Sequence, residues 1–94
     1  MIQKGSRRIF LVTIEQLRAA RALIGWSQSK LAEEAGVSLP TVKRVETGVG
    51  PRVSDRTRRK LQEALEAAGI LFLEEDGQGV GVRFRKPQKR AAGS

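Results

Sequence analysis

The chain has 94 residues, a formal net charge of +8 at pH 7 and a pI near 11.1. A chain of this length forms one small domain with a modest core, because it buries only about 60 to 65% of its unfolded surface. The absence of cysteine and histidine excludes disulfides, thiolate or imidazole metal sites and histidine acid–base catalysis. No apolar run approaches the ~18 residues that span a bilayer, so we expect a cytoplasmic protein. The positive charge indicates a polyanionic partner.

Residues 1–12 combine a basic cluster with an apolar run that extends from Ile9 to Val12. We interpret this segment as a disordered N-terminal arm. Two alternatives are a short strand over residues 8–12 and a basic arm that follows the phosphate backbone of DNA.

Thr13 starts the first predicted helix, because Gln16 three residues later completes a capping-box pattern. Apolar residues at helical spacing predict its buried stripe: Ile14, Leu17, Ala20 and Ile24. Arg21 falls on this stripe, where a charged side chain requires a partner. Gly25 ends the helix.

The next stretch, WSQSKLAEEAGVSLPTVKRVETG, predicts two short helices joined by a tight turn at Gly36. Ser27 and Ser38 are N-caps, because a serine hydroxyl accepts from the free backbone N–H groups of a first turn. An apolar pair flanks each cap as a hydrophobic staple: Trp26 with Leu31, and Val37 with Val42. This staple position favours a core role for Trp26 over base stacking. The pattern is that of a helix-turn-helix.

This stretch resembles the phage-repressor-like (Cro/CI, XRE) helix-turn-helix family of bacterial DNA-binding proteins, over roughly residues 14–68. The resemblance rests on residue types that fall in register: Arg21, Gly25, Ser27, Gln28, Leu31, Ala32, Gly36, Val37, Ser38, Thr41, Val42, Glu46 and Gly48. It implies a mainly α, four-to-five-helix repressor-like DNA-binding domain over residues 13–69. The alternative is a generic pair of core helices with no role in DNA binding.

The resemblance also implies roles for single residues. Arg21 is expected to form a structural ion pair with Glu46, and residues 39–47 to form the recognition helix. The candidates for reading bases are Ser38, Leu39, Pro40, Thr41 and Arg44. The candidates for phosphate contact are Gln28, at the positive end of a helix dipole, together with Lys43 at the rim, Thr47 and Arg52. Chemically, Arg44 can donate two hydrogen bonds to guanine.

A further helix follows, capped by Ser54 and ended by Gly69. Its buried stripe is expected at Leu61, Ala64, Leu65 and Ala68. We interpret the basic residues from Arg56 to Lys60 as a solvated face, with a flank for DNA as the alternative.

Residues 70–86 predict a β-hairpin, because two apolar, β-branched and aromatic runs are separated by the turn sequence EEDGQG. In its second strand we expect Val80, Val82 and Phe84 to share one face. A lone hairpin is marginally stable in water, so we expect a helix, the residue 8–12 strand or another subunit to cover it. Residues 87–94 are expected to be a disordered basic tail.

Together these features predict a bacterial sequence-specific transcriptional regulator, located in the cytoplasm and at the nucleoid when bound. One recognition helix reads few base pairs, so we expect a homodimer on an inverted-repeat operator in double-stranded DNA, with the hairpin and the helix that Ser54 caps as the expected dimer surfaces. We expect no catalysis, cofactor, metal or membrane contact, because the carboxylates fall on predicted exposed faces without a nucleophile. The alternative is an antitoxin or antiactivator that binds a protein partner and regulates its own gene.

Overall fold

The computed structural model describes residues 11–85 as four helices followed by a two-stranded antiparallel hairpin. The elements are α1 (Ile14–Leu23), α2 (Gln28–Ala35), α3 (Leu39–Thr47), α4 (Asp55–Ala67), β1 (Ile70–Leu73) and β2 (Gly81–Phe84). The predicted mainly α domain with a C-terminal hairpin is therefore confirmed. The predictions for the N-terminal arm up to residue 10 and for the tail at 87–94 lie outside the described residues.

Each helix begins at the residue that the sequence predicts. The side-chain oxygens of four residues accept a backbone N–H from the first turn of the helix that follows: Thr13, Ser27, Ser38 and Ser54. Gly36 ends α2 with a φ of 71°, and Gly48 ends α3 with a φ of 72°. A side chain is disfavoured at such angles, so the two glycines permit the sharp turns on either side of α3.

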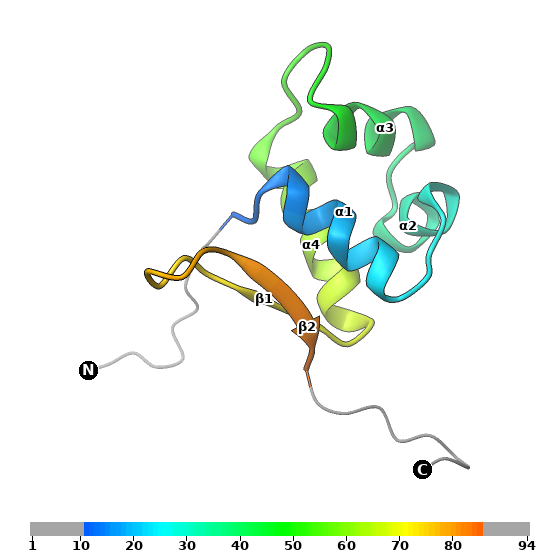
Figure 1. The fold of residues 1–94 in the computed structure, drawn as a ribbon. Coiled ribbons are helices and arrows are strands. Elements are labelled where there is room, and N and C mark those ends of the chain that lie inside the picture. The colour runs from blue at the N-terminus through cyan, green and yellow to red at the C-terminus, as the bar shows by residue number, and fades with distance from the viewer. Residues whose placement is uncertain (1–10, 86–94) are drawn as a thin grey trace, which may run out of the picture.

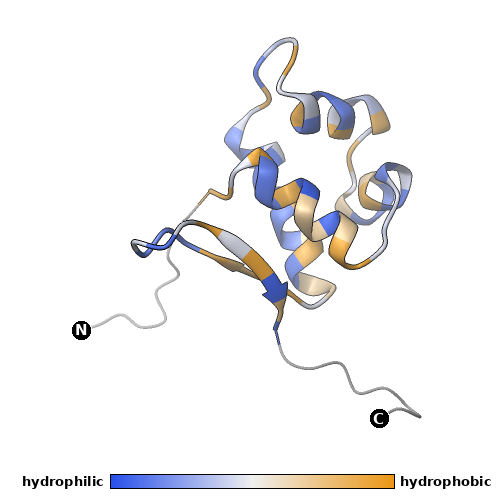
Figure 2. Ribbon diagram, in the orientation of Figure 1, coloured by the Kyte–Doolittle hydropathy of each residue, from blue (hydrophilic) through white to orange (hydrophobic). Residues whose placement is uncertain are grey.

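Helices α1 and α4 lie in the middle of the molecule, between α3 on one side and the hairpin on the other (Figure 1). Every helix and β1 supply at least one fully buried side chain to a single core: Leu17, Leu31, Val42, Leu65 and Ile70. Hydrophobic and hydrophilic positions alternate along each helix (Figure 2), as in helices that bury one face. The core therefore fixes how α3 is presented.

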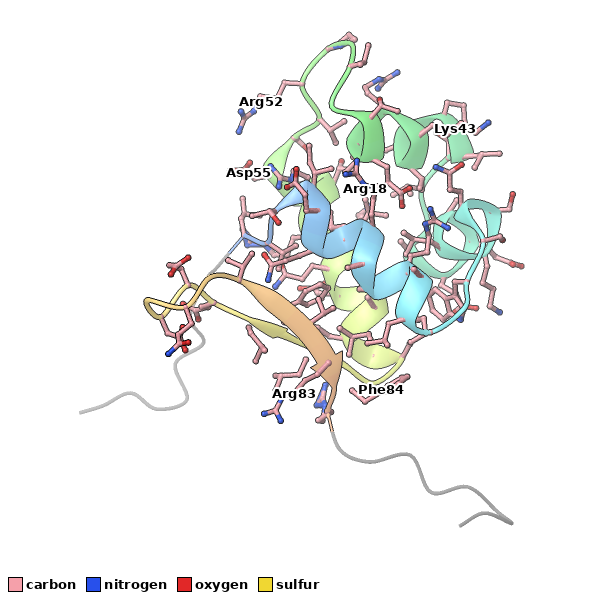
Figure 3. The ribbon with its side chains drawn as sticks, in the orientation of Figure 1. Arg18, Lys43, Arg52, Asp55, Arg83 and Phe84 are labelled. Atoms are coloured by element: carbon pink, nitrogen blue, oxygen red, sulfur yellow. The ribbon has the colours of Figure 1, made fainter. Side chains whose placement is uncertain are left out.

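The helices cover one face of the hairpin, which was the first of the three expected ways to stabilise it. Ile70 pairs with Phe84 and Phe72 with Val82, and all four side chains pack on the core. Val80 differs from the prediction: β2 begins one residue later, and Val80 is 43% exposed and does not join the covered face. Figure 3 shows Arg83, on the opposite face, pointing away from the helices.

Gln16 fastens α1 to the hairpin by a contact that the sequence did not indicate. Its side chain is 3% exposed, and its Oε1 accepts from the backbone N–H of Thr13 at 2.9 Å. Its Nε2 donates to the carbonyl oxygens of Leu73 at 3.0 Å and Gly81 at 2.9 Å. One amide thus takes part in the cap of α1 and satisfies two carbonyl oxygens of the hairpin.

Arg58 corrects the interpretation of the basic run from Arg56 to Lys60 as a solvated face. Its side chain is half-buried, and Nη2 donates to the carbonyl oxygen of Val12 at 2.6 Å. The physical reason is its position on α4: Arg58 lies three residues before the buried Leu61, on the inward side of the helix.

Candidate nucleic-acid interface

Helix α3 presents one exposed stripe to solvent. Four residues at helical spacing form this stripe: Pro40, Lys43, Arg44 and Thr47. The opposite side of α3 is buried through Val42, Val45 and Glu46. Figure 3 shows the Lys43 side chain pointing away from the rest of the molecule. The stripe therefore offers two cationic side chains and one apolar ring to any partner that meets α3.

The structure separates the five residues that the sequence proposed for reading bases. Pro40 and Arg44 lie on the exposed stripe. The Ser38 hydroxyl caps α3 and hydrogen-bonds with Oγ1 of the half-buried Thr41 at 2.8 Å. Leu39 is half-buried and packs against the core, so the expectation that it faces outward is wrong for part of its side chain. Leu39 lies three residues before Val42, and this spacing turns it toward the same face.

Two phosphate-contact candidates, Lys43 and Thr47, are exposed on the stripe itself. Lys43 was placed at the rim, but it stands in the middle of the exposed stripe, three residues after Pro40 and four before Thr47. The Thr47 hydroxyl donates to the carbonyl oxygen of Arg44 at 3.3 Å and accepts from the backbone N–H of Val49 at 3.1 Å. Thr47 therefore shapes the turn after α3.

Gln28 and Arg52 flank the stripe. Gln28 begins α2, and its Nε2 donates to Oε1 of Glu46 at 3.0 Å, which leaves its second amide N–H for another acceptor. Arg52 is exposed in the loop after α3, and its Nη2 lies 3.3 Å from Oδ1 of Asp55 (Figure 3). Both side chains thus retain donors for a phosphate oxygen.

A buried carboxylate holds α1, α2 and α3 in this arrangement. The Arg21 guanidinium donates to both oxygens of Glu46, from Nε to Oε2 at 2.7 Å and from Nη2 to Oε1 at 2.8 Å. Glu46 is 4% exposed and Arg21 is 22% exposed. Arg21 also donates to the carbonyl oxygen of Trp26, at the entry to α2. The ion pair expected from the resemblance is thus a two-bond contact that orients α3.

The surroundings of Glu46 keep it ionised. Burial by itself would raise the pKa of this carboxyl, but hydrogen bonds from Arg21 and Gln28 and the charges of Arg21 and Arg18 together hold the pKa below its ordinary value of 4.5. Arg18 also donates to the backbone carbonyl of Glu46, from the side of α1 that faces α3 (Figure 3). This contact was not predicted from the sequence, although Arg18 lies three residues before Arg21 and is therefore its neighbour on the surface of α1.

The interface as a whole is electropositive and rich in donors. Lys43, Arg44 and Arg52 are exposed on α3 and the following loop, and the N-terminus of α2 adds its partial positive charge. The nearby carboxylates are neutralised, since Glu46 pairs with Arg21 and Asp55 meets Arg52. A convex helix with such side chains suits the major groove, where guanine presents two acceptors.

Comparison with known proteins agrees with this geometry. A family model described as helix-turn-helix matches residues 17–68, which is more than half of the chain. No curated protein matches the sequence. Within residues 11–85, none of the helices combines the length and apolar character needed to cross a membrane. The chain belongs to the Cro/CI-like (XRE) helix-turn-helix family of DNA-binding transcriptional regulators.

Proposed function

We propose that this regulator reads a specific operator as a homodimer, with α3 of each copy in the major groove of one half of an inverted repeat. The observation that carries the proposal is the exposed stripe of α3, which the buried Arg21–Glu46 pair holds outward. The major groove of B-DNA is about 12 Å wide and admits a helix with its side chains.

The side chains of the stripe differ in the groups of DNA that they can contact. Arg44 carries two donors that match O6 and N7 of guanine, and Lys43 supplies a single flexible donor. Pro40 has only apolar contact to offer, for example to a thymine methyl group. Gln28 and Arg52 contact phosphates, which set the position of the protein on the duplex without reading its sequence. Lys43 therefore moves from the rim to the group of base-reading candidates.

A homodimer is proposed because one α3 reads few base pairs and two half-sites lie about 10 base pairs apart. The described sheet has two strands, so each strand has an edge without a neighbouring strand among residues 11–85. Such an edge is a template for pairing with another chain. Leu73 and Val80, 37% and 43% exposed, add apolar surface at the turn end of the hairpin. These features support the hairpin as the contact between copies.

Selection of bound duplexes from a random pool, at roughly physiological salt, tests this proposal. An enriched inverted repeat with half-sites about 10 base pairs apart is the expected result. Enrichment of single half-sites alone would contradict the dimer but keep sequence reading. Binding that only weakens with rising salt, without enrichment, would contradict sequence reading altogether.

The hairpin surface also provides a test of the alternative role as an antitoxin or antiactivator. In that case the purified protein would be monomeric, alone and on its DNA, and would form a stable complex with the product of a neighbouring gene. A dimer that persists on the selected operator would exclude this alternative as the main use of the hairpin.

A further inference from the structure

A cavity of about 270 Å³ lies beside the proposed DNA-binding surface, between the end of α3, the following loop and the first turns of α1 and α4. Its lining contains two kinds of side chain. Four are apolar: Ile14, Val45, Pro51 and Val53. Three are arginines: Arg44, Arg52 and Arg58. Arg58 is half-buried, whereas Arg44 and Arg52 are exposed, so the cavity places apolar surface beside three positive charges that solvent can reach to different extents.

The three arginines line the same cavity but make different contacts. Arg58 is fixed by its donation to the carbonyl oxygen of Val12, and its Nε is buried without a hydrogen-bond partner among the described residues. Arg44 lies along the loop, with Cγ 3.7 Å and Nε 3.8 Å from the point where a Cβ on Gly50 would sit. These distances are ordinary van der Waals contacts, so the Arg44 side chain leaves room for a Cβ, and it is the φ of 95° that favours glycine at position 50.

The charges around the cavity are poorly balanced. Among the ion pairs of the described residues, the one carboxylate that meets these three arginines is Asp55, at 3.3 Å from Arg52. Both Arg52 and Asp55 are exposed there, and such pairs are weak. The cavity therefore attracts an anion, and guanidinium groups suit carboxylate and phosphate groups in particular.

We infer that this cavity binds a small organic anion, with a carboxylate or phosphate group at the arginines and an apolar body against Ile14, Val45 and Val53. A phosphate of the DNA backbone would use the arginines but has no group for the apolar lining. The volume lies just below the usual range for ligand pockets, which limits the apolar body to about one ring or one branched chain.

Binding of such an anion would oppose DNA binding, a consequence that rests on the proposed function. Arg44 and Arg52 line the cavity and also belong to the proposed DNA interface. An anion at this position neutralises them and repels the phosphate backbone, and by linkage DNA weakens the anion to the same extent. The site would thus make the regulator responsive to a small acidic metabolite.

The test uses three probes on the full chain at constant ionic strength: benzoate, acetate and benzyl alcohol. We expect benzoate to shift the amide resonances of Gly48, Gly50 and Val53 in a saturable manner. Acetate has the charge without the ring and benzyl alcohol has the ring without the charge, so each should bind about tenfold or more weakly. Equal responses to benzoate and acetate, or shifts that never saturate, would overturn the inference.

Two variants separate the cavity from the general positive field of the surface. Arg44→Gln and Lys43→Gln each remove one positive charge from the exposed stripe of α3, but only Arg44 lines the cavity. We expect the affinity for benzoate to fall about tenfold in Arg44→Gln and to stay within about twofold in Lys43→Gln. An equal loss in both variants would contradict a specific site.

A DNA-binding titration distinguishes failure of this inference from failure of the proposed function. Benzoate should weaken binding to duplex DNA more than acetate does at the same ionic strength. Saturable benzoate binding without any DNA binding would keep the cavity site and reject the proposed function. If benzoate leaves DNA binding unchanged and DNA alone shifts the cavity resonances, the cavity contacts the phosphate backbone. This result would overturn the inference.

Discussion

At the scale of single residues, Glu46 connects three helices through one buried carboxylate. It lies on α3, accepts two hydrogen bonds from Arg21 of α1 and accepts a third from Gln28 of α2. A buried charge is tolerated when its oxygens are bonded in this way, and it becomes costly when a partner is removed. The carboxylate therefore makes the orientation of α3 depend on α1 and α2.

Replacement Arg21→Gln should lower the free energy of unfolding by about 2 to 4 kcal/mol, because it leaves the Glu46 charge buried with a weaker donor set. Urea denaturation monitored by circular dichroism measures the change. Lys30→Gln is the matched control, since it removes one partner of the exposed Lys30–Glu34 pair, 46% and 43% exposed, and should leave the midpoint unchanged. Equal effects of the two replacements would show that burial of the pair has no consequence.

The lowered pKa of Glu46 predicts how stability depends on pH. A carboxyl whose pKa is depressed by folding contributes stability above its ordinary value of 4.5, and this contribution is lost as the pH falls through the folded pKa. The free energy of unfolding should therefore decrease below about pH 4.5, and it should decrease less steeply in Glu46→Gln. Urea midpoints between about pH 6 and pH 3 measure both slopes. Parallel slopes in the two proteins would contradict the prediction.

Arg44→Ala should weaken binding to the selected operator by about 1 to 3 kcal/mol and relax the preference at one guanine. The expected cause is the loss of two donors to the base edge. Fluorescence anisotropy with the operator and single-base variants measures the effect. Gln28→Ala should weaken all of these sites evenly. Unchanged operator binding by Arg44→Ala would move the recognition surface elsewhere.

At the scale of elements, local sequence patterns predicted the helices and the hairpin, whereas most contacts between distant elements were not predicted. Caps such as Ser38 and turns such as Gly36 act within one turn of the chain, so their effect can be read from spacing. Gln16 was recognised as part of a capping box, but its bonds to Leu73 and Gly81 join residues 57 and 65 positions apart. The sequence offered one signal for these bonds: Gln16 lies four positions before the buried Ala20 and therefore falls on the inward face of α1. The fold was thus largely predictable, whereas its tertiary polar contacts were not, apart from the Arg21–Glu46 pair that the resemblance implied.

Gln16→Glu separates the two roles of this side chain. Glutamate can still accept from the backbone N–H of Thr13, but it cannot donate to the carbonyl oxygens of Leu73 and Gly81. We expect a loss of about 2 kcal/mol or more, with faster amide exchange in β1 and β2 than in α2 and α3. Hydrogen exchange measured by mass spectrometry or NMR resolves the elements. A uniform increase across all of them would show that Gln16 supports the whole domain rather than the hairpin.

At the scale of the whole molecule, the proposed DNA contact and the proposed dimer contact lie on opposite sides of α1 and α4 (Figure 1). This separation allows each to be changed without the other. Leu73→Lys should convert the dimer into a monomer, because it places a charge at the apolar end of the hairpin. Leu23→Lys is the matched control, since Leu23 is 40% exposed on α1 and Leu73 is 37% exposed on β1. Light scattering after size exclusion measures the mass, and dissociation by both variants or by neither would contradict the hairpin contact.

The core of this protein extends beyond the segment that the family model matches. Val12, Ile70 and Phe72 are buried core residues outside residues 17–68, and Gln16 ties the first helix to the last strand. A fragment limited to residues 17–68 would lack these side chains. The core residues that they cover would then be exposed to water. A portable unit, for grafting the recognition helix onto another protein or for building a chimeric regulator, therefore needs at least the stretch from Val12 to Phe84.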